Sequence, residues 1–175
     1  VFKNGFVKNK VLEFVGDGIA SLSADYRIGI DVMTTETACL SSIWRTDDDV
    51  IKEYYEIHGR SEDYKPLAPQ RAAYYDGAVV VELDKVEPMI AMPFHPSNAY
   101  TIAQLCADPG DVLRKVERDA KEHEGIEISL CDKIVNGKLR VAQGSISGCA
   151  GGTFENLCAA ADILSGRSLD DGEFV

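Results

Sequence analysis

The chain has 175 residues, 45% of them hydrophobic, and a formal net charge of −11. This apolar share excludes a disordered chain, and the length fits one large domain or two small ones. The acidic balance argues against a nucleic-acid-binding surface, which needs clustered Lys and Arg, and no apolar run approaches the length of a membrane span.

The first third of the sequence reads as a strand, a helix and a second strand. The apolar run 11–15 ends at a glycine-rich turn, and Ser21 is positioned to cap a helix with apolar residues at helical spacing as far as Met33. Glu36 follows, just before a small apolar run over 37–44 that is typical of a buried strand. A carboxylate at such a junction is either a solvated helix end or a group turned into a cleft.

The middle of the chain contains another helix and two extended segments. A capping box that begins at Thr46 predicts the helix, and residues 78–83 and 86–92 are expected to be extended. The segment Pro93-Phe94-His95-Pro96 cannot be helical through its prolines, so we place a domain boundary there. His95 is either an imidazole that faces a ligand or, more commonly in such a loop, a structural histidine.

The last third alternates helices and extended runs. Residues 101–106 and a segment capped by Asp111 are predicted helices. An Asn136-Gly137 pair, typical of a type I′ hairpin, precedes the apolar run 139–142. Because predicted strands and helices alternate, we expect an α/β fold in which a largely parallel sheet is layered with helices.

The most distinctive segment is a turn rich in glycine and serine at residues 144–153, with Cys149 at its centre. A helical pattern begins directly after it, at Phe154. Glycines let a backbone approach a ligand closely, and the start of a helix stabilises a thiolate. Cys149 is therefore the best single candidate for a metal ligand, a nucleophile or a redox thiol. The alternative is a buried cysteine in a tight strand-to-helix turn.

Familiar glycine-rich motifs do not fit this turn. No Gly-Lys-Ser/Thr follows it, and the spacing Gly144-x-x-x-Gly148 differs from the dinucleotide fingerprint. The three histidines show no zinc-like pairing with the cysteines. A cysteine nucleophile wants a histidine partner, for which His95 is the one loop histidine available. An iron–sulfur cluster needs several thiolates, so Cys149 would have to be joined by ligands from outside this chain.

Three blocks of sequence stand out together. The first joins Val11-Leu-Glu-Phe-Val-Gly-Asp-Gly18 to Met33-Thr-Thr-Glu36, the second runs over residues 80–96, and the third is Gly148-Cys149-Ala150-Gly151-Gly152-Thr153-Phe154-Glu155-Asn156. In order and spacing these blocks resemble the aconitase family of iron–sulfur hydro-lyases, in which the third block reads Ser-Cys-Thr-Asn-x-x-Tyr-Glu-Asp.

The resemblance implies a three-layer αβα fold, aconitase-like, with a mostly parallel sheet and helices on both faces. Residues 1–92 would form the second domain and residues 93–175 the beginning of the third. Cys149 would be a ligand of a [4Fe–4S] cluster, and Glu36 an active-site glutamate that faces its labile iron. The implied reaction removes water from a small hydroxy-carboxylic acid and adds it back, with iron acting as a Lewis acid.

The resemblance also implies that the chain is an internal fragment of a longer parent. The remaining cluster ligands and the catalytic base would come from the remaining domains of that parent. We therefore expect the isolated chain to be inactive and to lack the cluster. We expect neither a nucleic-acid nor a membrane partner, and five cysteines without a Cys-x-x-Cys pair favour a cytoplasmic location.

Three positions depart from the family pattern. Val32 stands where the family has an asparagine, and Ala150-Gly151 replaces Thr-Asn after the cluster cysteine. These changes remove polar groups, which favours an alternative: a non-catalytic small-molecule-binding or redox module that keeps the fold. A third hypothesis is a cysteine-nucleophile enzyme that uses Cys149 and His95.

Overall fold

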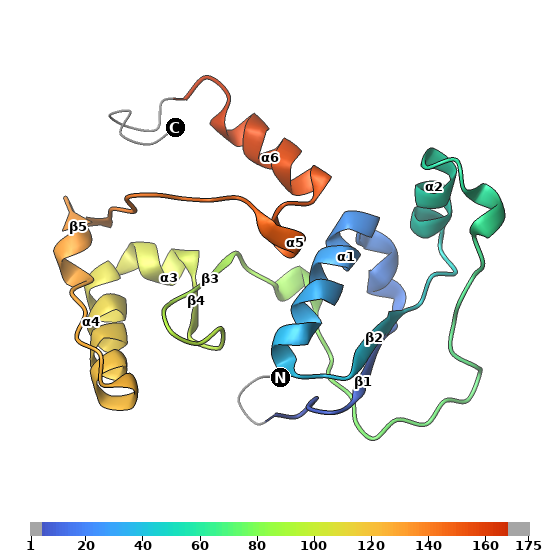
Figure 1. The fold of residues 1–175 in the computed structure, drawn as a ribbon, viewed down its shortest axis with the longest axis horizontal. Coiled ribbons are helices and arrows are strands. Elements are labelled where there is room, and N and C mark those ends of the chain that lie inside the picture. Colours follow the sequence, from blue (N-terminus) through green and yellow to red (C-terminus); the bar gives the residue numbers. More distant parts are fainter. Residues whose placement is uncertain (1–4, 168–175) are drawn as a thin grey trace. The chain divides into compact units, whose positions relative to one another are not determined.

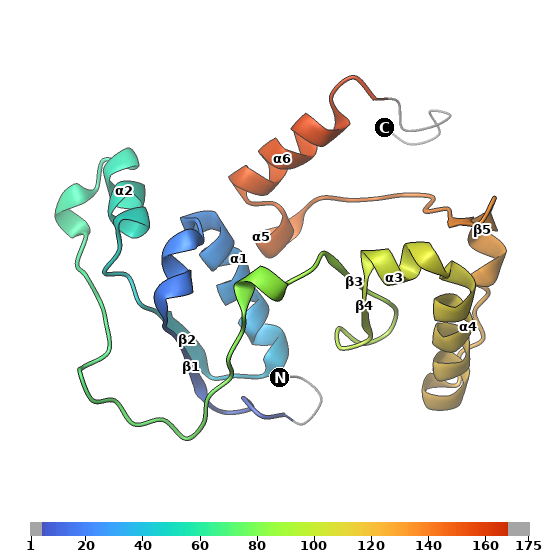
Figure 2. The same cartoon turned by 180° about the vertical axis from the view of Figure 1, so that it is seen from behind.

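The structure, a computed structural model, describes residues 5–167. The chain divides into two compact units, one made of residues 1–80 with 145–175 and the other of residues 81–144. Both units contain helices and short strands, which agrees with the prediction of an α/β chain (Figures 1 and 2). None of the helices within residues 5–167 combines the length and the apolar character that crossing a membrane requires.

The first unit is built around a parallel strand pair. β1 (Val11–Phe14) pairs with β2 (Ser41–Trp44), with Val11 opposite Ser41. Between them the chain forms a 3-10 turn (Asp17–Ser21), α1 (Ala24–Met33) and a second 3-10 turn (Thr34–Thr37). The remaining elements of this unit are α2 (Asp49–Ile57), a 3-10 turn (Ser61–Asp63), α5 (Gly148–Gly151) and α6 (Phe154–Leu164).

The second unit contains two antiparallel strand pairs and two helices. β3 (Met89–Ala91) pairs with β4 (Ala99–Thr101), which leads into α3 (Ile102–Ala107) and α4 (Pro109–Asp119). A π-helical turn (Ala120–Glu124) extends α4, and β5 (Ile134–Val135) forms a hairpin with β6 (Lys138–Leu139). Short 3-10 turns lie at Leu83–Lys85 and Cys131–Lys133. Met92, Leu113 and Val116 form the core of this unit.

Three helices begin close to the predicted positions but use other caps. Ser23, not Ser21, accepts the hydrogen bond of a backbone N–H in α1, because residues 17–21 form a 3-10 turn of their own. Asp48, not Thr46, caps α2, and Asp108, not Asp111, caps α4. In each case an acceptor nearer the first helical residue meets the unpaired N–H groups.

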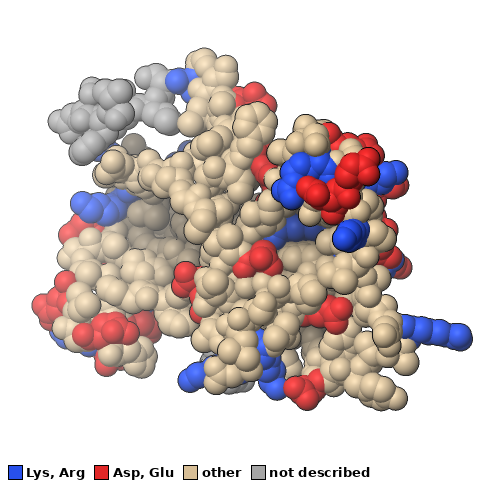
Figure 3. Space-filling view, turned by 45° about the vertical axis from the view of Figure 1, so that its right-hand side comes forward, with Lys and Arg blue, Asp and Glu red and all other residues tan. Residues whose placement is uncertain are grey.

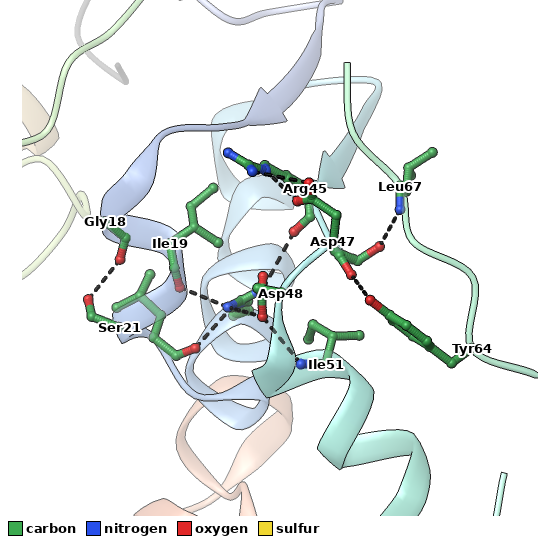
Figure 4. A network of polar contacts seen from close by, with 12 residues as sticks. Gly18, Ile19, Ser21, Arg45, Asp47, Asp48, Ile51, Tyr64 and Leu67 are labelled. Atoms are coloured by element: carbon green, nitrogen blue, oxygen red, sulfur yellow. Dashed lines mark hydrogen bonds and ion pairs between the residues drawn. The ribbon is translucent and has the colours of Figure 1, made fainter. Parts of the chain in front are cut away.

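Asp48 also receives the buried guanidinium of Arg27, which is only 3% exposed. Arg27 donates to both Asp48 carboxylate oxygens at 2.7 and 3.0 Å, and to the backbone oxygens of Leu22 and Ile19. Figure 4 shows Asp48 between the turn that contains Gly18 and the start of α2 near Ile51. This network joins α1, the turn before it and α2.

Several predicted strands are absent from the described residues. Residues 78–83 form no strand, and the side chains of Val79, Val80 and Val81 are exposed by 53 to 86%. Residues 139–142 contribute only Leu139 to a strand, the hairpin strand β6. The hairpin itself is confirmed, since Asn136 and Gly137 take φ angles of 51 and 75°, as a type I′ turn requires.

Candidate functional site

Cys149 lies on α5, a single helical turn, and its side chain is exposed. Gly148 opens the turn with a φ of 84°, and Gly152 closes it where an added Cβ would lie 2.7 Å from the Gly148 carbonyl oxygen. Both positions therefore require glycine. A Cβ at Gly151 would meet no atom within 4 Å, so the turn is open around the thiol. The alternative of a buried cysteine is wrong.

α5 packs directly against α1. A Cβ built on Gly29, in the middle of α1, would lie 3.5 Å from the carbonyl oxygen of Ala150. This is an ordinary van der Waals distance, so the Cys149 turn and α1 are in contact at Gly29. α1 continues into the 3-10 turn that contains Glu36, and the seven residues from Gly29 to Glu36 rise by about 11 Å.

Glu36 is exposed on the turn that ends α1. Hydroxyl groups of the neighbouring threonines bond back to the chain: Thr35 Oγ1 donates to the Val32 carbonyl at 2.8 Å and Thr37 Oγ1 to the Thr34 carbonyl at 2.6 Å. Ala38 then takes a left-handed conformation with a φ of 58°. The turn is therefore held by its own hydroxyls, which leaves the Glu36 carboxylate at the surface of the same unit that contains Cys149.

Asp31 connects the Glu36 turn to β2, a role that the sequence did not indicate. Its Oδ1 accepts a hydrogen bond from Ser42 Oγ at 2.5 Å and one from Trp44 Nε1 at 3.2 Å. Ser42 Oγ also lies 3.1 Å from Thr34 Oγ1. These contacts fasten the end of α1 to β2. The adjacent Val32 is half-buried, so the place of the family's asparagine offers no polar group.

The start of α6 contacts the start of α1. The backbone N–H of Glu155 donates to Asp25 Oδ2 at 3.0 Å, and Ser23 Oγ donates to Glu155 Oε2 at 2.5 Å. Asn156 Nδ2 donates to the Ala150 carbonyl at 3.1 Å. Asp25 lies in the first turn of α1, where a negative charge is favourable whatever its partner. A contact between residues 130 positions apart leaves no local signal.

His95 belongs to the second unit, and its Nδ1 is engaged within its own loop. It accepts a hydrogen bond from the backbone N–H of Ser97 at 3.1 Å and lies 2.8 Å from Ser97 Oγ. Because Nδ1 is an acceptor here, the ring proton of a neutral His95 is on Nε2. These contacts agree with a structural histidine in a loop that contains two prolines.

Two groups outside this region show altered acidity. Backbone N–H groups of Cys131 and Leu130 donate to Glu117 Oε1 at 2.8 and 2.6 Å and lower the pKa of Glu117. Burial, together with the Glu117 carboxylate, raises the pKa of the Cys131 thiol. The hydrogen bonds to Glu117 stabilise the packing of residues 130–131 on α4. The raised pKa keeps the Cys131 thiol protonated, so Cys131 is a poor candidate for a reactive thiolate.

Within residues 5–167, no three His, Cys, Asp or Glu side chains are grouped so that they could hold a metal ion. The exposed Cys149 thiol on its open turn fits one ligand position of a bulky iron–sulfur group. Cys39, by contrast, donates its thiol hydrogen to the Thr34 carbonyl at 3.3 Å. A complete set of cluster ligands would therefore need thiolates from beyond the described residues.

Comparison with known proteins gives one family. The model of the aconitase family (aconitate hydratase) matches residues 1–175. The 2,3-dimethylmalate dehydratase large subunit of Eubacterium barkeri is 33% identical over 161 residues, which cover 92% of this chain and 31% of that protein. The 3-isopropylmalate dehydratase large subunit of Acetivibrio thermocellus is 28% identical over 158 residues, 90% of this chain and 30% of that protein.

A more distant relative extends the same pattern. The mitochondrial homoaconitase of Candida parapsilosis is 27% identical over 186 residues, 97% of this chain and 22% of that protein. The chain thus spans less than a third of the length of these curated relatives. No solved structure gives a significant match.

Proposed function

Because the chain belongs to the aconitase family, we propose that it is part of a hydro-lyase, a dehydratase that removes water from a small hydroxy-carboxylic acid and adds it back. The observation that carries this proposal is the exposed Cys149 thiol on a turn packed against the helix that leads to Glu36. Two of the relatives named above are dehydratases of substituted malates, which supports a substrate of this class.

Cys149 and Glu36 have distinct roles in this proposal. Members of the family carry [4Fe–4S] clusters, which supply a Lewis-acidic iron for the leaving hydroxyl when bound. The Sγ of Cys149, as a thiolate, would be one of the ligands that hold the cluster. The Glu36 carboxylate accepts a hydrogen bond from the hydroxyl group that leaves or from the water that enters. The remaining ligands and the base come from the remaining domains, so the isolated chain, without the cluster, is inactive.

The same proposal covers the domain organisation. Residues 1–92 form the second domain and residues 93–175 the beginning of the third, within three αβα layers and a mostly parallel sheet. The parallel pair β1–β2 with α1 supports this arrangement. On this assignment α5 and α6 belong to the third domain but pack with α1 of the second. Cys149 and Glu36 then come from different domains of the parent, although both lie in the first compact unit.

The proposed partners are the acid substrate and the remaining domains of the parent, without nucleic acid or membrane. On the face shown in Figure 3, the lysine and arginine side chains are scattered, and several lie beside acidic ones, which supports the exclusion of nucleic acid. Free thiols at all five cysteines support a cytoplasmic location.

A second candidate is a non-catalytic binding or redox module that retains the fold. Val32 favours it, because an apolar side chain occupies the place of the family's asparagine beside the Glu36 turn. The pairing of Cys149 with a His95 base has less support, since the Nδ1 of His95 is engaged by Ser97.

Reconstitution of the full-length protein with iron and sulfide tests these candidates. We expect visible absorbance of a cluster and dehydration of 3-isopropylmalate or 2,3-dimethylmalate, both lost in Cys149→Ser. Cys106→Ser is the matched control, because Cys106 is another exposed cysteine and lies on α3 in the second unit. A cluster without turnover on any hydroxy-acid would favour the second candidate. Full cluster content in Cys149→Ser would contradict the role of Cys149.

A further inference from the structure

We propose that Asp25, Ser23 and Asn156 are positioning residues that hold the Cys149 turn by joining the starts of α1 and α6. The geometry of this contact stands on its own. Its consequence for cluster retention rests on the proposed function, in which Cys149 is a cluster ligand.

Asp25 supplies the N-terminal cap that α6 lacks. Thr153 occupies the N-cap position of α6 but makes no side-chain capping bond. Instead Asp25 Oδ2, from the first turn of α1, accepts the hydrogen bond of the Glu155 N–H at 3.0 Å. A carboxylate at that place satisfies an unpaired N–H and is favoured by the helix dipole. The start of α6 is thereby fixed to another helix.

Ser23 completes the exchange in the opposite direction. Its Oγ caps α1 by accepting from the Tyr26 N–H at 3.1 Å, and it donates its own hydrogen to Glu155 Oε2. Each helix therefore places a carboxylate at the start of the other. Because both contacts join the same two helix ends, neither end can shift along the other without breaking a charge-assisted bond.

Asn156 carries this constraint to the cysteine. It lies next to Glu155 and donates from Nδ2 to the carbonyl of Ala150, the residue after Cys149. The same carbonyl faces α1 at Gly29, where an added Cβ would lie 3.5 Å from its oxygen. The Ala150–Gly151 peptide, one residue beyond Cys149, is therefore in contact with both α1 and α6, so the position of the Cys149 turn depends on both helices.

Hydrogen exchange in the full-length, cluster-free protein tests the contact directly. In Asp25→Ala we expect the amides of residues 154–156 to exchange about tenfold faster, because the Glu155 N–H loses its acceptor. Glu53→Ala is the matched control: it removes one exposed carboxylate from α2 and is expected to leave exchange at residues 154–156 unchanged. Unchanged exchange in Asp25→Ala would overturn the proposal.

Cluster retention tests the positioning role. After reconstitution, we expect Asp25→Ala and Asn156→Ala to lose visible cluster absorbance several times faster in the presence of an iron chelator. Asp25→Asn keeps an acceptor oxygen, so its rate of cluster loss should be close to that of the unsubstituted protein. If Asp25→Ala also speeds amide exchange throughout α2, the substitution has unfolded the first unit. The positioning role is then judged from cluster loss in Asn156→Ala alone. Retention equal to that of the unsubstituted protein in Asn156→Ala would overturn the role.

The proposed function and the contact between the two helices can be contradicted independently. An unsubstituted protein that forms no cluster would contradict the proposed function, while exchange at residues 154–156 would still decide the contact between the two helices.

Discussion

Arg27 is the one charged side chain that is almost fully buried within the described residues. Its guanidinium pairs with Asp48, of which 17% remains exposed, and its other donors are used by backbone carbonyls. Such a pair contributes little relative to apolar residues of similar volume, but removing one partner leaves an uncompensated buried charge. The pair also caps α2 through Asp48, so its loss affects two helices.

We predict that Asp48→Ala lowers the free energy of unfolding of the first unit by about 3 to 5 kcal/mol, since Arg27 is left buried without a counter-ion. Urea unfolding followed by circular dichroism measures the change. The control is Asp63→Ala, which breaks the exposed Arg60–Asp63 pair and should cost at most about 1 kcal/mol. Equal losses of unfolding free energy in the two variants would show that the buried Arg27–Asp48 pair contributes no more to stability than an exposed ion pair.

At the scale of elements, a single carboxylate fastens residues 130–131 to α4. Two backbone N–H groups donate to Glu117 and lower its pKa below the ordinary value of 4.5. A carboxylate with a lowered folded-state pKa stabilises the packing above pH 4.5. That stabilisation is lost as the pH falls through the folded-state pKa.

We therefore predict that the amide resonances of Leu130 and Cys131 titrate together with a midpoint below pH 4.5 in an NMR pH series. In Glu117→Gln, which retains an acceptor oxygen, this titration should disappear. Glu127→Gln is the control, because Glu127 pairs only with the exposed Lys121 in the contacts of the described residues. Persistence of the titration in Glu117→Gln would assign it to another group.

Local signals predicted helices and the hairpin well. Helical spacing and nearby capping residues placed α1, α2 and α6 to within a few residues. Asn136 and Gly137 readily take the positive φ angles that a type I′ turn requires, so this pair alone predicted the hairpin. Predicted strands such as 78–83 failed because a strand needs a partner, and the apolar run alone does not supply one. Val80 is 86% exposed for that reason.

The candidate site was predicted only in part. Residue type and glycine content pointed to Cys149, and the family motif pointed to Glu36. Neither of these signals could show that the Cys149 turn contacts α1 at Gly29, or that Asp25 caps α6. Both contacts join residues more than a hundred positions apart. Such packing has no periodic or local trace in the sequence.

At the scale of the molecule, α6 is an apolar helix that few other residues of the chain contact. Its residues are apolar on nearly every side, yet none is buried, and Phe154 and Ile163 are 78 and 64% exposed. A helix that is hydrophobic all round is normally buried. The relatives are more than three times as long as the matched segment. We therefore expect the remaining domains of the parent to cover α6.

This expectation predicts different behaviour of the 175-residue chain and the full-length protein. The isolated chain should bind the dye ANS, which reports exposed apolar surface, and iodoacetamide should label the exposed Cys158 quickly. In the full-length protein both signals should fall several-fold, because residues outside the chain bury α6. Ile163→Ser in the isolated chain, which removes an exposed apolar side chain, should weaken the dye signal without changing the labelling of Cys106. Equal dye binding and equal Cys158 labelling in both forms would mean that α6 stays uncovered in the parent.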